Sequence, residues 1–320
     1  MRARVRSRAR TRQRPEHDEA IPAFVVAVDR GRYSCRTPDG RIVTAMRARE
    51  LGRRAVVVGD NVRLVGDVGG GTDALARIVR VDERKSVLRR TADDDDPVER
   101  IVVANADQLV IVTALADPPP RPRLIDRCLV AAFDAHLDPL LCLTKADLAD
   151  PGELLAAYAP LGVSAVVTSR EHLDDDIATL RERLSGRISV MVGHSGVGKS
   201  TLVNRLVPDA DRAIGAVSDL TGRGRHTSSS AVALALPGGG WIVDTPGIRS
   251  FGLAHVAPET VLAAFPDLAP AAADCPPGCT HAVDAPGCAL PGHVAAGHAE
   301  PARLESLRRL LAARDRTADD

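Results

Sequence analysis

One glycine-rich stretch in the second half of the chain constrains the fold more than any other part of the sequence. It has the spacing G-x-x-x-x-G-K-S and lies between an apolar run at 188–192 and an apolar pattern at Leu202, Val203 and Leu206. This order predicts a strand, a loop and a helix, with loop N–H groups turned around a phosphate at the positively polarised start of the helix. The candidate phosphate-binding residues are Gly193, His194, Ser195, Gly196, Val197, Gly198, Lys199, Ser200 and Thr201.

Lysine usage favours this phosphate-loop interpretation over a chance match. The only lysines of the chain are Lys85, Lys145 and Lys199, among 42 Lys and Arg residues. Where Arg is used almost everywhere else, a Lys indicates a position that needs a compact ammonium group. We therefore expect Lys199 to reach the β- and γ-phosphates of a nucleotide, and the Ser200 hydroxyl to bind Mg²⁺.

A second motif, Thr144-Lys145-Ala146-Asp147, follows an apolar run at 140–143 and predicts guanine recognition. The Asp147 carboxylate can accept hydrogen bonds from guanine N1–H and the 2-amino group, a donor pair that adenine lacks. The stem of Lys145 can lie across the base, and backbone N–H at Ser169 could bind the guanine carbonyl. Alone the motif is weak, because Lys-x-Asp is common on surfaces and Thr144 stands where Asn usually opens it.

A third stretch, Asp-Thr-Pro-Gly, adds metal and switch functions. It follows the apolar run 241–243 and contains Asp244, whose carboxylate can hold Mg²⁺ through water, and Gly247, whose N–H can meet the γ-phosphate. Thr227 is the candidate second hydroxyl on Mg²⁺, beside Ser200. These loops would supply phosphate, base and metal contacts at strand ends, where α/β folds bind ligands.

The residues around the switch also bear on catalysis. Ile248 follows Gly247 at the position where many GTPases place a water-orienting Gln, so intrinsic turnover should be slow. We take Lys199, Thr227 and His226 as the candidate catalytic residues. His226 would orient or activate water once RNA orders its loop, and the alternative is that His226 only contacts RNA.

The order of the motifs is unusual, because 144–147 precedes 193–201 whereas ordinary GTPases begin with the phosphate loop. A circular permutation would give this order and leave the site intact, since ligand loops depend on which strands are neighbours. Alternating strands and helices predict a mostly parallel sheet. The expected strands are 108–114, 139–143, 164–168, 188–192, 231–236 and 241–243, and the expected helices are 124–136 and 171–184.

The N-terminal part shows a different pattern, of short strands and turns. Strands are expected at 23–28, 33–37, 41–45, 61–65 and 76–81, which favours a small barrel of the oligonucleotide-binding type. Residues 1–90 hold 22 Lys and Arg against 11 Asp and Glu, which points to a polyanionic partner. Aromatic residues are few here, so charge and backbone shape should carry RNA binding.

Three cysteines near the C-terminus predict a metal centre. Cys275, Cys279, His281 and Cys288 have the composition and compact spacing of a closed tetrahedral Zn²⁺ site. His293 and His298 could substitute as ligands, though exposed histidines are the simpler interpretation. A helix with a leucine face is expected at 301–313. The other cysteines, Cys35, Cys128 and Cys142, are expected to be buried thiols.

These patterns divide the chain into five parts. We expect a basic, disordered arm at 1–19, an oligonucleotide-binding barrel at 20–90, an acidic linker at 91–98, a circularly permuted α/β nucleotide domain at 99–253 and a helical zinc-binding module at 254–320. No apolar run has the length of a membrane span, and residues 1–14 lack the apolar centre of a signal peptide. We therefore expect a cytoplasmic protein without a membrane partner, acting as a monomer.

The combination resembles the bacterial ribosome small-subunit-dependent GTPases, over roughly residues 20–315. The resemblance extends to 84–90 and 104–108, and the chain departs from it at Thr144, at Ser228 and Ser229, and in the spacing of the Cys/His cluster. It implies a GTPase that uses Mg²⁺, carries one structural Zn²⁺, is stimulated by the small ribosomal subunit and its rRNA, and acts late in maturation of that subunit.

Two alternatives come from other classes. A P-loop ATPase or small-molecule kinase would share 193–201 but would need no guanine motif, so a comparison of GTP with ATP binding separates the two. A non-catalytic RNA-binding chaperone would depend on the barrel and the basic arm alone, and it would release no phosphate.

Overall fold

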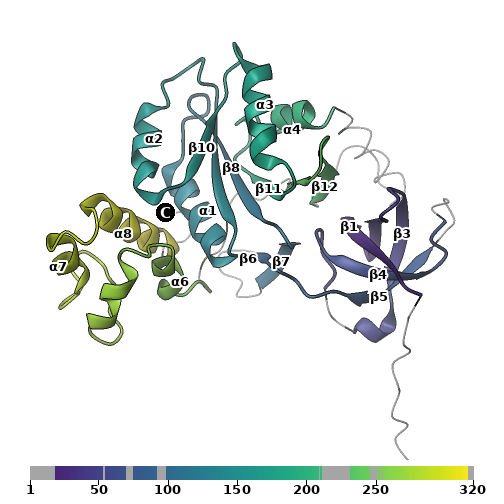
Figure 1. The fold of residues 1–320 in the computed structure, drawn as a ribbon, viewed down its shortest axis with the longest axis horizontal. Helices are drawn as coiled ribbons and strands as arrows, with labels where there is room; N and C mark the ends of the chain where they lie inside the picture. The colour runs from purple at the N-terminus through teal and green to yellow at the C-terminus, as the bar shows by residue number, and fades with distance from the viewer. Residues whose placement is uncertain are drawn as a thin grey trace, which may run out of the picture.

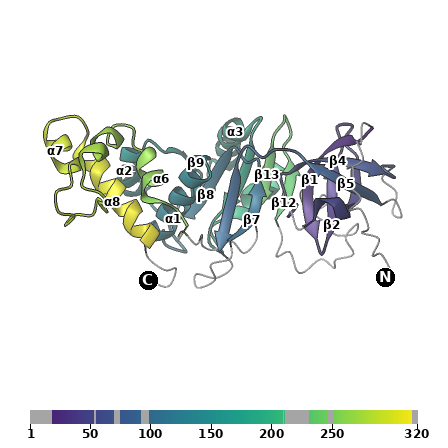
Figure 2. The same ribbon diagram turned by 90° about the horizontal axis from the view of Figure 1, so that it is seen from below.

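The chain folds into three parts that follow one another in a row, a barrel, an α/β sheet and a helical module (Figures 1 and 2). The structure is a computed structural model that describes residues 19–52, 55–69, 75–91, 99–208, 210, 231–245, 251, 253 and 255–315. The predicted arm at 1–19 lies almost entirely outside these residues, as do Thr227, His226 and Gly247.

The N-terminal part is the small barrel expected from the sequence. Its strands are β1 (Ile21–Asp29), β2 (Arg32–Arg36), β3 (Ile42–Arg47), β4 (Asn61–Gly66) and β5 (Ala76–Val81), with a 3-10 turn at Arg49–Leu51. The strands pair in the order β1-β2-β3-β5-β4, and β4 also pairs with β1, which closes the barrel. Because side chains alternate along a strand, about every second residue points into the barrel. The fully buried residues there include Val25, Cys35, Val43, Leu64 and Ile78.

A two-stranded antiparallel sheet follows the barrel and was not part of the sequence prediction. It consists of β6 (Val87–Thr91) and β7 (Glu99–Ala104). The segment predicted as an acidic linker therefore begins at the last residue of β6, and the remainder, 92–98, lies outside the described residues. The side-chain pattern of β6 and β7 includes several charged residues, which is why it gave no strand signal.

The central part is a mostly parallel sheet, as predicted. Its order is β10-β9-β8-β11-β13-β12, and only β12 runs antiparallel to its neighbour in this part. The strands are β8 (Gln108–Ala114), β9 (Asp138–Thr144), β10 (Ser164–Val167), β11 (Ile188–Val192), β12 (Val232–Ala235) and β13 (Trp241–Asp244). The connecting helices are α1 (Pro122–Asp134), α2 (Gly152–Tyr158), α3 (Leu173–Leu184) and α4 (Lys199–Leu206), with a 3-10 turn at Ala159–Leu161.

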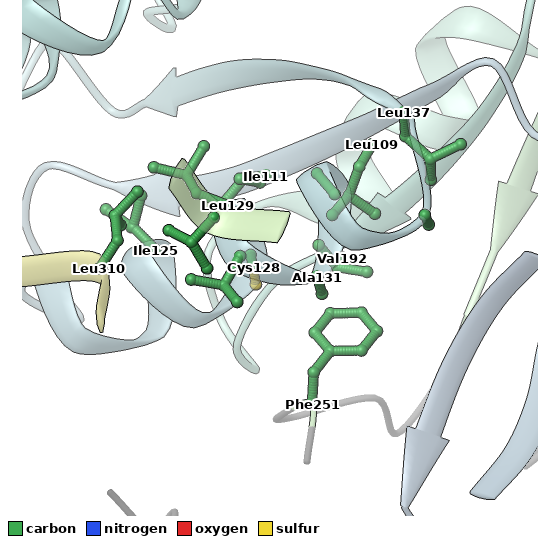
Figure 3. Packing of buried hydrophobic residues seen from close by; sticks show 14 of the residues in the cluster. Leu109, Ile111, Ile125, Cys128, Leu129, Ala131, Leu137, Val192, Phe251 and Leu310 are labelled. Atoms are coloured by element: carbon green, nitrogen blue, oxygen red, sulfur yellow. The ribbon is translucent and has the colours of Figure 1, made fainter. Parts of the chain in front are cut away.

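Helices cover both faces of this sheet, because successive residues of a buried strand point to opposite sides. Val110 and Val112 of β8 pack with α3 and α4, whereas Leu109 and Ile111 pack with α1 on the other face. Figure 3 shows this second face, where Phe251 lies near Ala131 of α1 and Val192 of β11.

The C-terminal module is helical and packs on the outside of α1. It contains α6 (Pro258–Ala263), a 3-10 turn at Ala269–Asp274, α7 (Leu290–Ala295) and α8 (Pro301–Asp315). The predicted leucine face of α8 is buried, and the helix contacts α1, as the position of Leu310 beside Ile125 shows (Figure 3). Asp126 of α1 is almost fully buried and pairs with Arg309 of α8, with 3.1 Å between Oδ1 and Nε.

The barrel and the central sheet are joined by backbone pairing. β1 pairs with β12 at Ala27 and Val232, so that one sheet of 11 strands runs through both parts. The rings of Phe24 on β1 and Trp241 on β13 lie 4.6 Å apart between centroids beside this pairing. The two parts are therefore joined by strand pairing and a ring contact as well as by the chain itself.

A buried polar cluster forms a second connection. The Asp60 carboxylate is fully buried and accepts two hydrogen bonds from the Arg84 guanidinium, at 2.7 and 2.8 Å. Asn105, after β7, donates through Nδ2 to the Gly59 carbonyl and accepts from the Lys85 N–H, both at 2.8 Å. Because each polar group has a partner, burial of the pair is offset by charge-assisted hydrogen bonds.

Among the described residues, no helix combines the length and the apolarity that crossing a bilayer requires.

Gly59 gives a direct test of the polar connection between the barrel and the central sheet. Its φ is +91°, and a Cβ built on it would lie 2.0 Å from the Ala104 carbonyl oxygen, so Gly59→Ala must displace the backbone of one part. Gly66 is the matched control, because its φ is also +91° but a Cβ there would meet its nearest atom at 3.8 Å. Both substitutions incur the left-handed penalty of ~1–2 kcal/mol. We expect Gly59→Ala to lower the free energy of unfolding by at least ~2 kcal/mol more than Gly66→Ala, as measured by urea denaturation followed through Trp241 fluorescence. Equal losses in the two variants would contradict the close contact.

Candidate functional site

The loops that carry the predicted motifs leave one edge of the central sheet. β8, β9, β10, β11 and β13 are parallel, so their carboxyl ends lie together. The base motif begins at the last residue of β9, Ser169 follows β10, the phosphate loop follows β11, and Asp244 ends β13. The sequence order of the motifs is permuted, yet the pairing of the strands brings their ends to the same edge.

The phosphate loop is held against β8 at its first glycine. A Cβ on Gly193 would lie 2.5 Å from the Val112 carbonyl oxygen, so a side chain cannot be accommodated there. Helix α4 begins at Lys199, and its start is buried underneath by Leu202 and Val203. Ser195, Gly196, Ser200 and Thr201 are exposed at the edge of the sheet, as a loop that binds a ligand through its N–H groups requires.

Lys199 lies beside the carboxylate of β13. Its Nζ is 2.7 Å from Asp244 Oδ1, because Met191 of β11 and Asp244 are direct partners in the register of the sheet. Both side chains are mostly buried, at 15% and 24% exposed. The two groups predicted to meet the phosphates and the metal therefore lie together, over the start of α4.

Thr144 ties the base motif to the phosphate loop. Its hydroxyl donates to the Val197 carbonyl at 2.6 Å. The Thr113 carbonyl oxygen lies 3.4 Å from the Thr144 hydroxyl oxygen. Thr144 is buried, at 4% exposed. The residue that departs from the usual Asn thus connects the two loops through its own hydroxyl.

The remaining residues of the base motif are half-buried beside the β10 loop. Asp147 Oδ1 accepts the Arg170 N–H at 3.1 Å, and the Ala146 N–H donates to the Thr168 carbonyl at 3.1 Å. The Ser169 N–H donates instead to Asp176 Oδ2 at 2.8 Å. The Asp147 carboxylate is therefore hydrogen-bonded by the backbone of Arg170, whereas the Ser169 N–H is directed to Asp176.

Two contributors to this edge, Asp117 and Thr245, were not assigned a role from the sequence. Lys145 has a φ of +62° and donates through Nζ to the carbonyl of Asp117, which follows β8. Thr245, after β13, is buried and donates through Oγ1 to the Met191 carbonyl at 2.8 Å. The sequence signal that could have predicted an ordered loop after β8 is the run of three prolines that follows Asp117, since proline fixes φ.

The predicted zinc ligands converge in the C-terminal module. Ligand atoms of Cys275, Cys279, His281 and Cys288 all lie within 4.8 Å of one another. His281 Nδ1 is 3.7 Å from the Sγ atoms of both Cys275 and Cys288. Ligand atoms at Zn–S and Zn–N bond lengths are separated by ~3.5–3.8 Å across a tetrahedron, so the cluster could hold a metal such as zinc.

The protonation chemistry of the cluster agrees with this donor set. Burial lowers the pKa of His281, so at neutral pH the imidazole is in the neutral form that binds metals. Burial raises the pKa of the Cys288 thiol to about 11, and coordination would reverse this by deprotonating the sulfur. The Ala289 N–H points at Cys275 Sγ, 3.2 Å away, as suits a thiolate acceptor.

The two alternative histidines lie apart from the cluster. The ring of His293 packs against that of His298, with 4.8 Å between centroids, and His293 Nε2 is 2.9 Å from the Asp267 carbonyl oxygen. Neither belongs to the group of possible ligands found among the described residues.

Comparisons with known proteins agree with this geometry. The family model described as "RsgA GTPase" matches residues 81–254. A protein of Chlorobaculum parvum named small ribosomal subunit biogenesis GTPase RsgA is 37% identical over 307 residues, covering 92% of this chain and 98% of its own. The chain belongs to the RsgA GTPase family. It is therefore a GTPase, as the resemblance implied.

Two solved structures match the fold of this chain over most of its length. The crystal structure of YjeQ from Thermotoga maritima matches with a TM-score of 0.68 at 26% identity, covering 92% of this chain and 98% of that one. YloQ, described as a circularly permuted GTPase, matches in fold with a TM-score of 0.66 at 20% identity, covering 96% and 98%. The predicted fold class, with its permuted GTPase domain, is confirmed.

Thr144 is the first site residue to test in this RsgA GTPase. Thr144→Val keeps the branched shape but removes the donor, which leaves the Val197 carbonyl unpaired, whereas Thr144→Ser keeps the hydroxyl. The loss of a partner for a buried carbonyl costs ~1–3 kcal/mol. We expect Thr144→Val to raise the Kd for a fluorescent GDP analogue about tenfold, and Thr144→Ser to stay within about threefold. Equal Kd values for the two variants would show that the hydroxyl does not support the site.

A second test addresses the metal cluster through thiol reactivity. Burial raises the pKa values of Cys35, Cys128 and Cys142 to about 12, so these thiols should stay unreactive in the folded protein. Addition of a chelator should release the other three thiols, because a bound metal would occupy them. We expect alkylation followed by peptide mass spectrometry to find three modified cysteines after chelation and none before it. Modification of the cluster before chelation would contradict metal binding.

Proposed function

We propose that this GTPase hydrolyses GTP to GDP and phosphate in late maturation of the small ribosomal subunit. The subunit stimulates the activity, and rRNA binds through the barrel and the metal-binding module. The names of the curated relatives support this role. So does the charge of 20–90, which holds 15 Lys and Arg against 8 Asp and Glu, since a basic surface attracts a polyanion.

The single observation that carries the proposal is the meeting of three motif loops at one sheet edge. Residues 193–201 bind the phosphates, Lys145 and Asp147 bind the base, and Ser169 closes the pocket beside them. The hydroxyl of Thr144, 2.6 Å from the Val197 carbonyl, supports a common pocket for base and phosphates. Guanine rather than adenine fits the Asp147 carboxylate because guanine offers two donors to it.

Hydrolysis in this proposal proceeds by attack of water on the γ-phosphorus, with cleavage of the bond to the β,γ-bridging oxygen. Lys199 stabilises the charge on the transferring phosphoryl group. Ser200 and Thr227 would hold Mg²⁺, with Asp244 acting through water, and the ion would neutralise phosphate charge when it is bound. The Gly247 N–H meets the γ-phosphate, and His226 orients the water. The 2.7 Å contact of Lys199 with Asp244 supports their assignment to one site.

Zinc in the Cys/His cluster has a structural role in the proposal. All four candidate positions are filled by protein side chains, which is typical of structural rather than catalytic zinc. We further propose the five-part division of the chain given above, a cytoplasmic location and a monomeric working form.

The decisive assay measures phosphate release from GTP and ATP, with and without purified small subunits. We expect slow release from GTP alone, a rate at least tenfold higher with subunits, and no stimulated release from ATP. Stimulated ATP hydrolysis would favour the P-loop ATPase alternative, and an absence of release under all conditions would favour the RNA chaperone.

The base assignment is tested by Asp147→Asn. The amide offers only one acceptor oxygen, so the guanine 2-amino group loses a partner while xanthine gains one. We expect GTP affinity to fall at least tenfold and xanthosine triphosphate to bind more tightly than GTP. Asp138→Asn is the matched control, because Asp138 begins β9, the strand that leads into the base motif, and so lies at the opposite edge of the sheet. An unchanged GTP affinity in Asp147→Asn would remove the assignment.

A further inference from the structure

A pocket lies where the barrel meets the central sheet, away from the nucleotide edge. Its volume is about 470 Å³, within the range of ~300–1,000 Å³ that is usual for small-molecule pockets. Of its lining residues, six carry the chemistry and define what we call the junction pocket: Phe24, Arg36, Asn61, Arg63, Asp82 and Trp241. These residues come from β1, β2, β4, the segment after β5, and β13.

Flat, stackable groups are concentrated in the junction pocket. Trp241 is the only tryptophan of a chain in which aromatic residues make up 2% of the sequence. Its ring contacts Phe24 at 4.6 Å between centroids, and the Arg36 guanidinium lies 5.2 Å from its centroid. Nucleobases stack on aromatic rings and on Arg guanidinium planes, and such contacts contribute ~1–3 kcal/mol per base.

Polar groups line the same pocket. Arg63 pairs with Asp82 at 3.4 Å, and both side chains retain about 30% exposure. Asn61 is exposed and offers an amide with both a donor and an acceptor. A base edge can be bound by an amide or a carboxylate, and a phosphate by a guanidinium, so the lining supplies partners for each part of a nucleotide.

We propose that the junction pocket binds one unpaired nucleotide of single-stranded RNA, with its base stacked at Arg36 and Trp241 and its phosphate at Arg63. The inference rests on the proposed function in that RNA is taken as the partner of the barrel. Single strands fit better than duplexes because a paired base is stacked between its neighbours and cannot enter a pocket. The positive excess of 20–90 matches an RNA strand in charge.

The sole tryptophan provides a built-in probe for the test. The full chain is titrated with octauridylate, octaadenylate and a fully paired RNA hairpin while Trp241 fluorescence is recorded. We expect saturable quenching by the two single strands. The hairpin should produce less than a fifth of that change at equal nucleotide concentration.

Two charge variants separate the pocket from general attraction. Arg36→Gln removes a cation that touches Trp241, whereas Arg77→Gln removes an exposed cation of β5 that does not line the pocket. Arg36→Gln should raise the Kd for octauridylate about tenfold and Arg77→Gln less than twofold. Arg63→Gln serves as a second pocket variant and should raise the Kd about fivefold, in case the loss of Arg36 disturbs the barrel.

The outcomes distinguish this inference from the proposed function. Absence of quenching, equal losses in the pocket and control variants, or equal quenching by the hairpin would overturn the pocket inference. A change in Trp241 fluorescence with small subunits but not with RNA would also overturn it, since a protein would then be the occupant. If subunits still stimulate GTP hydrolysis in any of these cases, the proposed function stands. If subunits do not stimulate hydrolysis, the proposed function fails independently of the pocket inference.

Discussion

The placement of β11 between β8 and β13 is the constraint on which the nucleotide site depends. Val192, the last residue of β11, pairs with Ile111, and Met191 pairs with Asp244, so β11 and β13 end at nearly the same height while β8 continues to Ala114. The phosphate loop then leaves β11 between the last residues of β8 and the end of β13, and Gly193 allows it to pass against the Val112 carbonyl. A permuted chain keeps this site because strand neighbours, rather than chain order, determine which loops meet.

Periodicity made much of this fold predictable, and its limits explain the rest. The strands of the barrel and of the parallel sheet were found because continuous apolar runs or alternation bounded by glycine are strong signals. The hairpin of β6 and β7 and the short helices α2, α6 and α7 were not, since five to seven residues carry too little periodic signal and tertiary contacts decide their form. The predicted boundary near residue 90 falls within such a segment.

The candidate site was predictable where a motif dictates a residue type, and less so where a backbone group does the work. Lys199, Asp147 and the Cys/His cluster could be named because phosphate, guanine and metal each need particular side chains. The Arg170 N–H beside Asp147 and the Asp117 carbonyl that receives Lys145 have no such signature, because every residue carries these groups. Only the fold indicates which of them lie at the site.

The pairing of Ala27 with Val232 has a consequence for how the chain is assembled during synthesis. The first half of β1, at Ile21 to Phe24, pairs with β4, so the barrel can close on itself soon after it emerges from the ribosome. The second half of β1 pairs with β2 along one edge, but its other edge must wait for β12, which is made some two hundred residues later. During that interval the newly made barrel exposes a partly open strand edge, which is a template for mispairing until the last strands of the sheet cover it.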